Sequence, residues 1–426
     1  MNIHMQIGWK RHIGRLSLVL VLSTALLAQR SSPALSPIVD ANSRFAFKLF
    51  KQLTTETPDH NILVAPTGLS LAFGLLNNGS DPETRKEIES VFEFTGMDRA
   101  EINDGFAALR KEMNLVTSPP QKQGTKAGSP APWADNPNRL VIADSLWIKH
   151  GYFGKQFLSA SRNYYGLDLQ RLLPSSSPSA QVSRWASKQV HRNVPITMGT
   201  MARNDFLLVN VTRFHSFWEH HFESSMTRPT PFALLSGQKK EVPMMYQQRN
   251  FDYIEGPKFQ AVVLPYDQNA SMYVFLPAED SSLKELEQTL TAKNWQEWLS
   301  QFNFREGMVG LPKFKTETGF DVRAALRELG VKRIFEQFTA LQPAVTIPEG
   351  ARLAGAIQKT ELSVDEEGTE AISVVFAGGI PGGVAGGMPG QERPKPFVMI
   401  VDRPFFFAIR HNPTGQLLFM GAVVEP

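Results

Sequence analysis

Residues 361–405 place the strongest constraint on the fold, because they join a strand pattern to a segment that cannot pack. Apolar and polar residues alternate in Glu361–Asp365, which predicts a strand with one buried face. A second run, 372–376, is rich in β-branched residues and leads directly into residues 378–390, in which glycine and proline predominate. Each glycine adds chain entropy that folding must overcome, so these residues predict an exposed loop. The fold must therefore hold strand-forming residues at the base of a long loop.

Residues 365–371, at the start of this loop, have the sequence Asp-Glu-Glu-Gly-Thr-Glu-Ala. This motif is similar to the hinge of the reactive-centre loop in the serpins, a family of serine protease inhibitors. Residues 402–407, Asp-Arg-Pro-Phe-Phe-Phe, and 418–421, Leu-Phe-Met-Gly, are similar to the C-terminal strands of that family. Shorter matches recur in the family's order along the chain, and the resemblance covers about residues 38–426.

The resemblance implies an α+β fold with three β-sheets, a helical shell and one exposed reactive-centre loop, with the hinge and loop at residues 366–403. In serpins a serine protease attacks this loop and forms a covalent acyl-enzyme. The cut loop then inserts into the central sheet as a new strand before water can release the protease. The resemblance thus predicts a monomeric serine-type endopeptidase inhibitor that is not an enzyme, has no catalytic residues and uses no cofactor or metal.

The resemblance also assigns roles to two groups of residues. The hinge comprises Glu366, Glu367, Gly368, Thr369, Glu370 and Ala371, and glycine supplies the backbone freedom that insertion requires. The region where the sheet opens includes Asn210, Trp218 and Gln358. The family usually has histidine at the position of Gln358, and glutamine can hydrogen bond but cannot become charged. Ala65 and Gly68 likewise replace serines that are usual in the family.

The length of the inserted strand predicts the bond that the protease cuts. A strand rises about 3.3 Å per residue, so roughly sixteen residues cross about 50 Å of sheet. Counting from Glu366 reaches Gly382, and the predicted reactive bond is Gly382–Gly383, with Gly383–Val384 as the alternative. Met388–Pro389 and Arg393–Pro394 are less suitable, because proline on the leaving-group side fits serine proteases poorly. The small residues around the predicted bond indicate an elastase-like or subtilisin-like target.

A second class of function stays open: a serpin-fold protein that binds, stores or chaperones other molecules without inhibiting a protease. Ile372 and Val374 are larger than the residues usual in inhibitor hinges. If Thr369 faces the core after insertion, the compact residues two, four and six positions further on do so too. Ile372 and Val374 would then lie on the outer face, where β-branched residues favour a strand. Inhibition is therefore the predicted function.

The N-terminus predicts export. Lys10, Arg11 and Arg15 precede an apolar run, residues 16–28, in the pattern of a secretory signal peptide that comprises residues 1–28. This run is short for a membrane span, although an uncleaved anchor stays an alternative. The mature protein is predicted to be secreted, to the extracellular space or the periplasm, and to have no membrane association after signal removal.

Composition excludes several other functions. The chain has no cysteine in 426 residues, which excludes disulfides, thiol catalysis and thiolate metal sites. Its formal net charge of +3 is too small to argue for a nucleic-acid partner. A hydrophobic content of 42% is enough to bury a large core without disulfides.

Three local motifs are better explained by structure than by chemistry. Residues 117–137 are rich in proline and glycine and predict a surface insertion whose two lysines are too few for a heparin-type site. The histidines of residues 215–221 do not have the spacing of a common metal site. Ser70 lies in an apolar helical run, not on the strained turn of a hydrolase nucleophile.

The first half of the chain predicts further elements. Residues 42–50 have helical spacing, with Asn42 or Ser43 as the cap. A short strand is predicted to end before Pro66, and a buried helix to follow at residues 68–76. Residues 140–147 have a strand pattern, and the apolar run 206–214 predicts a strand in the middle of a sheet.

Overall fold

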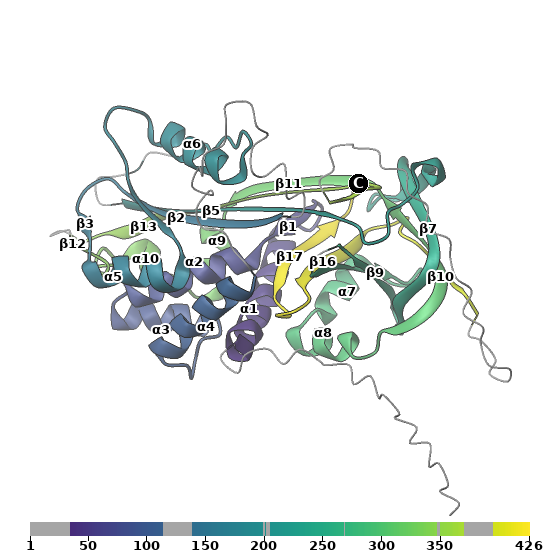
Figure 1. Ribbon diagram of the computed structural model, residues 1–426, viewed down its shortest axis with the longest axis horizontal. Coiled ribbons are helices and arrows are strands. Elements are labelled where there is room, and N and C mark those ends of the chain that lie inside the picture. Colours follow the sequence, from purple (N-terminus) through teal and green to yellow (C-terminus); the bar gives the residue numbers. More distant parts are fainter. Residues whose placement is uncertain are drawn as a thin grey trace, which may run out of the picture. The chain divides into compact units, whose positions relative to one another are not determined.

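The computed structural model describes residues 35–113, 139–198, 201, 205–267, 269–346, 350–369 and 395–426 (Figure 1). These residues belong to one compact unit, Ser31–Pro426. The predicted signal peptide, residues 1–28, and the predicted surface insertion, residues 117–137, lie outside the described residues. In the described part of the chain, no helix has both the length and the apolar character needed to cross a membrane.

The larger sheet has strands at its centre that are covered on both faces and others that are partly exposed. Every residue of β9 and of β17 is buried, which explains their nearly continuous apolar sequences. In the order of the sheet, its strands are β1 (Ile62–Val64), β17 (Leu417–Val423), β16 (Phe405–His411), β9 (Ala270–Pro277), β8 (Phe259–Pro265), β7 (Lys239–Glu255), β10 (Asn303–Pro312) and β15 (Phe397–Ile400), and β6 (Arg228–Ala233) pairs with β7.

The central sheet contains the strands that carry the hinge and its neighbours. In the order of the sheet they are β11 (Phe314–Asp321), β13 (Arg352–Val364), β14 (Gly368–Thr369), β5 (Asp205–Phe217), β2 (Arg139–Ile148) and β4 (Asp168–Arg171). In β13, Leu362 and Val364 are buried while Glu361 and Ser363 are partly exposed, which confirms the predicted alternation. A third, small sheet pairs β3 (Tyr152–Phe153) with β12 (Val345–Thr346).

Strand β5 is buried along most of its length because helices cover the central sheet on both sides (Figure 1). Phe206 and Leu208 belong to the main core, together with residues of α2 and of the larger sheet. Leu207 and Val209 belong to a second core, which is formed with α6 and includes Val141, Trp147, Leu172, Val182, Trp185, Ala186, Val190, Ile196, Met201 and Val211. This two-sided burial confirms that residues 206–214 form a strand in the middle of a sheet.

The helices in the described ranges are mostly short and amphipathic. They are α1 (Leu35–Glu56), α2 (Pro66–Asn78), α3 (Pro82–Val91), α4 (Arg99–Glu112), α5 (Lys155–Ala160), α6 (Pro178–Val190), α7 (Leu283–Thr289), α8 (Ala292–Leu299), α9 (Arg323–Leu329) and α10 (Arg333–Glu336), with a π-helical turn at Ser161–Tyr165 and a 3₁₀ turn at Ser224–Met226. The predicted α+β fold with three sheets and a helical shell is confirmed.

Two predictions for the first helices have different outcomes. The helix predicted at residues 42–50 is longer, since α1 includes Leu35–Glu56, and the prediction that Asn42 or Ser43 caps it is wrong. Asn42 instead lies inside the helix, buried, and its Nδ2 donates to Gln416 Oε1 at 3.1 Å. The buried helix predicted at residues 68–76 is confirmed, and Pro66 occupies its first turn.

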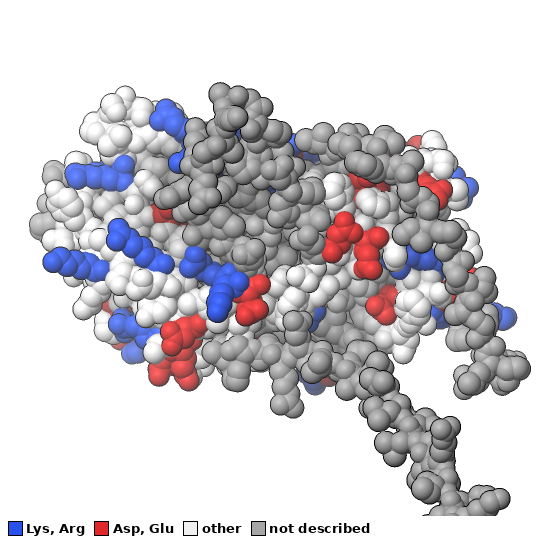
Figure 2. All heavy atoms as spheres, viewed as in Figure 1, with Lys and Arg blue, Asp and Glu red and all other residues white. Residues whose placement is uncertain are grey.

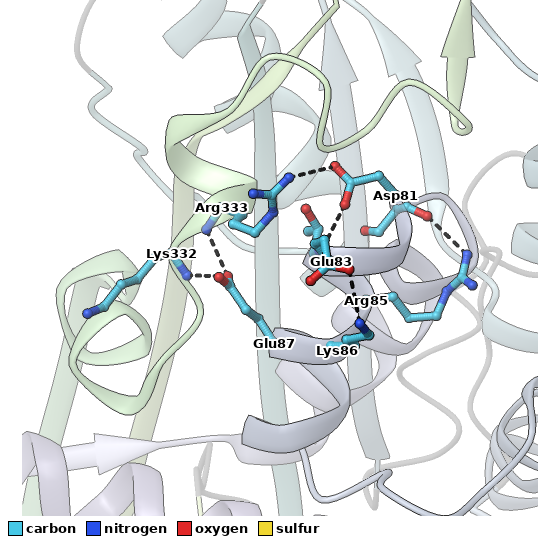
Figure 3. Close-up of polar contacts among 9 residues, drawn as sticks. Asp81, Glu83, Arg85, Lys86, Glu87, Lys332 and Arg333 are labelled. Atoms are coloured by element: carbon cyan, nitrogen blue, oxygen red, sulfur yellow. Dashed lines mark hydrogen bonds and ion pairs between the residues drawn. The ribbon is translucent and has the colours of Figure 1, made fainter.

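Acidic side chains tie α3 to the segment that begins α10 (Figure 3). Glu87 Oε2 accepts hydrogen bonds at 2.8 Å from the backbone N–H groups of both Lys332 and Arg333. Asp81 caps α3 by accepting from Thr84 N, and its other oxygen lies 3.4 Å from an Arg333 Nη2. These contacts join α3 to the start of α10, in the part of the chain that precedes β13.

Charged side chains of both signs share the face of the molecule shown in Figure 2. Lysine and arginine lie close to aspartate and glutamate there, so the described atoms on this face do not form the field of a single sign that nucleic-acid binding uses. Within the described ranges, no group of three or more histidine, aspartate or glutamate side chains is arranged to hold a metal ion.

Candidate functional site

The hinge begins with a tight turn that Asp365 forms. Its Oδ1 accepts from the backbone N–H groups of Glu367 at 3.0 Å and Gly368 at 3.3 Å. Its own N–H donates to Gly368 O at 3.0 Å. An aspartate that binds the backbone two or three residues ahead reverses the chain locally. The chain therefore leaves β13 and returns as β14 in the opposite direction.

Strand β14 occupies the start of a strand position between β13 and β5. Thr369 pairs with Val364 on one side and with Ser216 on the other, and Gly368 pairs with Phe217. Beyond this hinge end, β13 and β5 pair directly with each other in parallel, as far as Arg352 and Asp205 at the far end of the sheet. A longer strand at this position would have to separate β13 from β5.

Glycine is required at position 368 for space. A Cβ atom there would overlap with the carbonyl oxygen of Ser216 and would lie 2.7 Å from Phe217 Cα. Both are backbone atoms of β5, which cannot move aside as a side chain can. The close approach of the two strands is therefore a second reason for glycine, beside the backbone freedom predicted from the sequence.

The side chain of Thr369 points into the core. Only 1% of the residue is exposed, and its Oγ1 lies 2.6 Å from the hydroxyl of Tyr266. Tyr266 in turn stacks on Trp218 with ring centroids 4.4 Å apart and contacts Phe214 edge to face. Burial raises the pKa of Tyr266 above its usual range, so this hydroxyl stays neutral. The first inward-facing residue of the hinge thus already occupies a closed aromatic pocket.

Trp218 and the residues after it hold the backbone of the hinge. The indole Nε1 of Trp218 donates to Asp365 O at 2.9 Å, and its backbone N–H donates to Glu367 O at 2.9 Å. The N–H of Phe222 donates to Glu366 O at 3.0 Å. Three successive carbonyls, those of Asp365 and of the first two hinge residues, are therefore bound, which places Trp218 at the hinge end of the sheet, beside β14.

Glu366 anchors the hinge by its side chain. Its Oε2 lies 2.6 Å from Lys313 Nζ, and its Oε1 accepts from Thr227 Oγ1 at 2.8 Å. Burial raises the pKa of Glu366, but the hydrogen bonds from Lys313 and Thr227 lower it more, so the net pKa lies below the usual range. Glu367 is more exposed, and its Oε2 lies 3.4 Å from His221 Nδ1.

Replacing Glu366 by lysine is expected to destabilise the hinge end. The change removes two hydrogen bonds to a carboxylate and places two ammonium groups together, which should lower the free energy of unfolding by about 2 kcal/mol after discounting for solvent around Lys313. Urea unfolding of the intact protein measures this loss. The matched control is Glu367→Lys, the same change on an exposed carboxylate, for which we expect a much smaller effect.

The pH dependence gives an independent check on the role of Glu366. Because its folded pKa is depressed, its stabilisation is present above the ordinary value of 4.5 and is lost as pH falls through the folded pKa. The stability difference between the wild type and Glu366→Gln should therefore shrink on acidification. A difference that stays constant from neutral pH to about pH 3 would contradict this role.

Asn210 and Gln358, predicted to lie where the sheet opens, are cross-strand partners at the middle of the sheet. Gln358 Nε2 donates to Asn210 Oδ1 at 2.9 Å and to Ala65 O at 2.9 Å, while Ala65 N donates to Gln358 Oε1 at 3.1 Å. Asn210 Oδ1 also accepts from Thr212 Oγ1 at 3.2 Å, and Asn210 Nδ2 donates to Asp144 Oδ1 at 2.9 Å. The structure thus brings two predicted residues together and adds Asp144.

Two substitutions relative to the usual family pattern have a structural explanation. A Cβ atom on Gly68 would overlap with the side-chain amide of Asn210, so glycine leaves room for the hydrogen-bonded position of that amide. Ala65 contributes only its backbone N–H and C=O, which bind the amide of Gln358. A side-chain amide can use both groups at once, which a single ring nitrogen of histidine cannot.

Sequence reasoning missed Asp144, although a signal was present. In residues 139–148 (Arg-Leu-Val-Ile-Ala-Asp-Ser-Leu-Trp-Ile), Asp144 shares the alternating set of Ile142, Leu146 and Ile148. The side chains of that set are buried in the main core. An ionisable residue in a core-facing position of a strand is uncommon and marks a polar network.

The other predicted site residues cannot be placed. Glu370 and Ala371 of the hinge, and Gly382 and Gly383 of the predicted reactive bond, lie outside the described residues. Their assignments stay predictions. The described chain resumes before β15, which pairs in parallel with β10 in the larger sheet.

Comparisons with known proteins agree with this arrangement. The model of the family described as "Serpin (serine protease inhibitor)" matches residues 40–426. Leukocyte elastase inhibitor of Bos taurus is 29% identical over 402 residues, which cover 91% of this chain and 98% of that protein. Human neuroserpin is 28% identical over 91% of both chains.

Solved structures show the same fold. The thermophilic serpin tengpin in its native state has a TM-score of 0.77 at 24% identity, with 91% of this chain and 94% of that chain covered. The complex of human thyroxine-binding globulin with thyroxine has a TM-score of 0.77 at 24% identity, over 92% of this chain and 99% of that chain. With a family match over residues 40–426, the chain belongs to the serpin family of serine protease inhibitors and is not an enzyme.

Proposed function

We propose that this protein traps a serine protease as a covalent acyl-enzyme and then inserts its cut loop between β5 and β13. The observation that carries this proposal is the position of β14, which pairs with both strands. Gly368 and Thr369 therefore occupy the first two places of the strand that insertion would complete. The network around Trp218 and Glu366 holds this start in register.

The register of β14 can be extended along the sheet to test its fit. Thr369 pairs with Ser216 and Val364, so an antiparallel continuation would place Ser373 opposite both Thr212 and Thr360. Those two residues already pair with each other across the closed sheet. Thr360 Oγ1 is buried and has no hydrogen-bond partner among the described residues. A serine hydroxyl at this place would supply the missing partner, which favours insertion.

The same register bears on the two large hinge residues. Ile372 would lie opposite Arg213 and Glu361, which are only partly buried, and Val374 would lie opposite Val211 of the second core. Both would therefore face away from the main core. This placement supports inhibition over the non-inhibitory alternative of a binding, storage or chaperone-like protein.

The register also supports the predicted reactive bond. In this register, residue 380 would pair with Asp205, the residue of β5 that lies farthest from the hinge. Gly382–Gly383 lies two residues further, at the end of a fully inserted strand. The small residues there, together with relatives named leukocyte elastase inhibitor in cattle and human, support an elastase-like target, with subtilisin-like enzymes as the second candidate.

Mixing the mature protein with an elastase or with subtilisin is expected to give a complex that survives denaturing electrophoresis. An acyl bond withstands the detergent, whereas a reversible complex does not. The matched control is the same protease with its catalytic serine replaced by alanine, which cannot form the bond. Recovery of only clipped protein and fully active protease across several such enzymes would contradict inhibition and favour the binding or storage alternative.

Mass spectrometry of the fragment released from the complex is expected to locate the cut. A fragment that starts at Gly383 supports the predicted bond, and one that starts at Val384 supports the alternative. A fragment that starts directly after Arg393 would contradict both and would indicate a protease specific for basic residues.

The proposed site of action is outside the cell that makes the protein. The basic and apolar residues of the predicted signal peptide support secretion, to the extracellular space or the periplasm. The proposed active form is a monomer with one protease partner and no membrane association after signal removal. Chemical sequencing of the N-terminus of the exported protein tests this point, because removal of residues 1–28 would be visible directly.

A further inference from the structure

A directed chain of hydrogen bonds crosses the middle of the central sheet and ends at Asp144. It begins at the backbone of Ala65, whose N–H can only donate and whose C=O can only accept. These two groups fix the amide of Gln358, which then presents an N–H to Asn210. Asn210 must therefore turn its own N–H toward Asp144. The backbone of Ala65 thus determines which group donates and which accepts in each of the hydrogen bonds from Ala65 to Asp144.

The hydrogen bonds of Asn210 determine what a protonated Asp144 can bind in the closed sheet. Asn210 Oδ1 already accepts from both Gln358 and Thr212, which uses its two lone pairs. In the described part of the chain, the bond from Asn210 is the only hydrogen bond to the Asp144 carboxyl. In the closed sheet Asn210 Oδ1 is therefore not free to accept the proton of a protonated Asp144, and an ionised Asp144 is a charge on a residue that is only 5% exposed.

The charges that face Asp144 are few. Helix α2 has no ionisable residue, and α4 contributes Arg110, which is partly buried. On β4, Asp168 pairs with Ser145, and its carboxylate accepts from Trp185 at 2.7 Å beside the second core. Burial raises the pKa of Asp144 to about 8, although the hydrogen bond from Asn210 and the charge of Arg110 oppose that rise.

Opening of the sheet would free Asn210 Oδ1 to accept the proton of Asp144. Neighbouring strands lie about 4.8 Å apart, so a strand inserted between β5 and β13 would move Asn210 and Gln358 to about 10 Å and break their bond. The extended register places Val375 between them, and valine offers no polar replacement. Asn210 Oδ1 would then be free to accept the proton of Asp144, while Asn210 Nδ2 could still donate to it.

We propose that Asp144 is a positioning residue for loop insertion: its protonated form stabilises the opened sheet by a second hydrogen bond to Asn210. The opened sheet thus binds this proton more tightly than the closed sheet, so lower pH favours opening. No bond other than hydrogen bonds is made or broken. The inference rests on the proposed function, because it requires that β5 and β13 separate.

The test uses the intact protein and a fluorescent peptide with the sequence of residues 369–382, whose insertion is followed by anisotropy. In the wild type, the insertion rate is expected to fall roughly five- to tenfold between about pH 7 and about pH 9.5, the effect of one hydrogen bond that depends on a proton. This range lies above the usual titration of histidine. Asp144→Asn keeps the shape and a permanent N–H donor, so its rate should stay high and constant.

The exposed change Asp104→Asn is the matched control and should keep the pH dependence of the wild type. An Asp144→Asn protein with that same pH dependence, or a wild-type rate that is constant, would overturn this proposal alone. A peptide that inserts at no pH would overturn both this proposal and the proposed function. If Asp144→Asn does not fold, calorimetry of the wild type near pH 8 in two buffers of different ionisation enthalpy decides. Proton uptake on peptide insertion supports the proposal, and its absence overturns it.

Discussion

Thr369→Arg is expected to convert the protein from an inhibitor into a substrate of its protease. Thr369 is 1% exposed, and its hydroxyl lies 2.6 Å from that of Tyr266 in a pocket formed with Trp218. An arginine cannot enter this pocket without burying an unpaired charge, which costs several kcal/mol. Since Thr369 is already buried as the start of the inserting strand, an arginine would force this start out of the sheet. Insertion would then lack its first paired residues, and water would release the protease first.

The number of inhibitor molecules cleaved per protease molecule inhibited measures this effect. We expect a rise of about a hundredfold or more, because each 1.4 kcal/mol on the insertion barrier changes the partition about tenfold. Thr369→Ser is the matched control, since it keeps the hydroxyl and the small volume, and it should inhibit as the wild type does. A Thr369→Arg protein that forms the acyl complex efficiently would contradict insertion from this end.

Cutting the loop anywhere between Gly378 and Pro389 is expected to raise the unfolding temperature by about 15 °C or more. The continuation of β14 would add residues 370–380 to the sheet, with a ladder to β5 and another to β13. The direct ladder between those two strands would be lost. The net gain is on the order of ten hydrogen bonds at about 1 kcal/mol each.

Calorimetry of the intact and the cut protein checks this prediction. The cut Thr369→Arg protein is the control, because its loop should stay outside the sheet and leave the unfolding temperature unchanged. If the cut wild type melts with the intact protein, the loop does not insert, and the non-inhibitory alternative gains support. Ile372 and Val374 would then be the first residues to replace by alanine.

The elements of this site could be predicted from sequence because each has a local signal. Alternation at 361–365 indicated the end of the strand Arg352–Val364, and the mainly apolar run 206–214 indicated the mid-sheet strand Asp205–Phe217. The resemblance assigned the hinge and the pair Asn210 and Gln358; the structure pairs these two residues, and the assigned roles stay predictions. The prediction of a cap at Asn42 or Ser43 was wrong because a polar residue at a helix start and one that bonds across the core look alike in sequence.

What the sequence did not reveal depends on contacts between distant segments. The pairing of Thr369 with both Val364 and Ser216 has no local signal, because it is a property of two strands brought together by the whole fold. The same holds for the space beside Gly368, which the backbone of β5 limits. The bonding of Asp144 became visible only when β2 was placed beside β5.

The second core has a mechanical consequence, since it decides along which line the central sheet can part. Its side chains come mainly from β2, β5 and α6, whereas β13 contributes only the partly exposed Ile357 among the described residues. The antiparallel strands β2 and β5 are thus packed together against α6, and we expect them to move as one unit. Among the described residues, the parallel pair β5 and β13 shares little of this second core, and an ion pair between Arg352 and Asp205 spans it at the far end. A strand that enters at the hinge end is therefore expected to separate β5 from β13 and to leave the pairing of β2 with β5 unchanged.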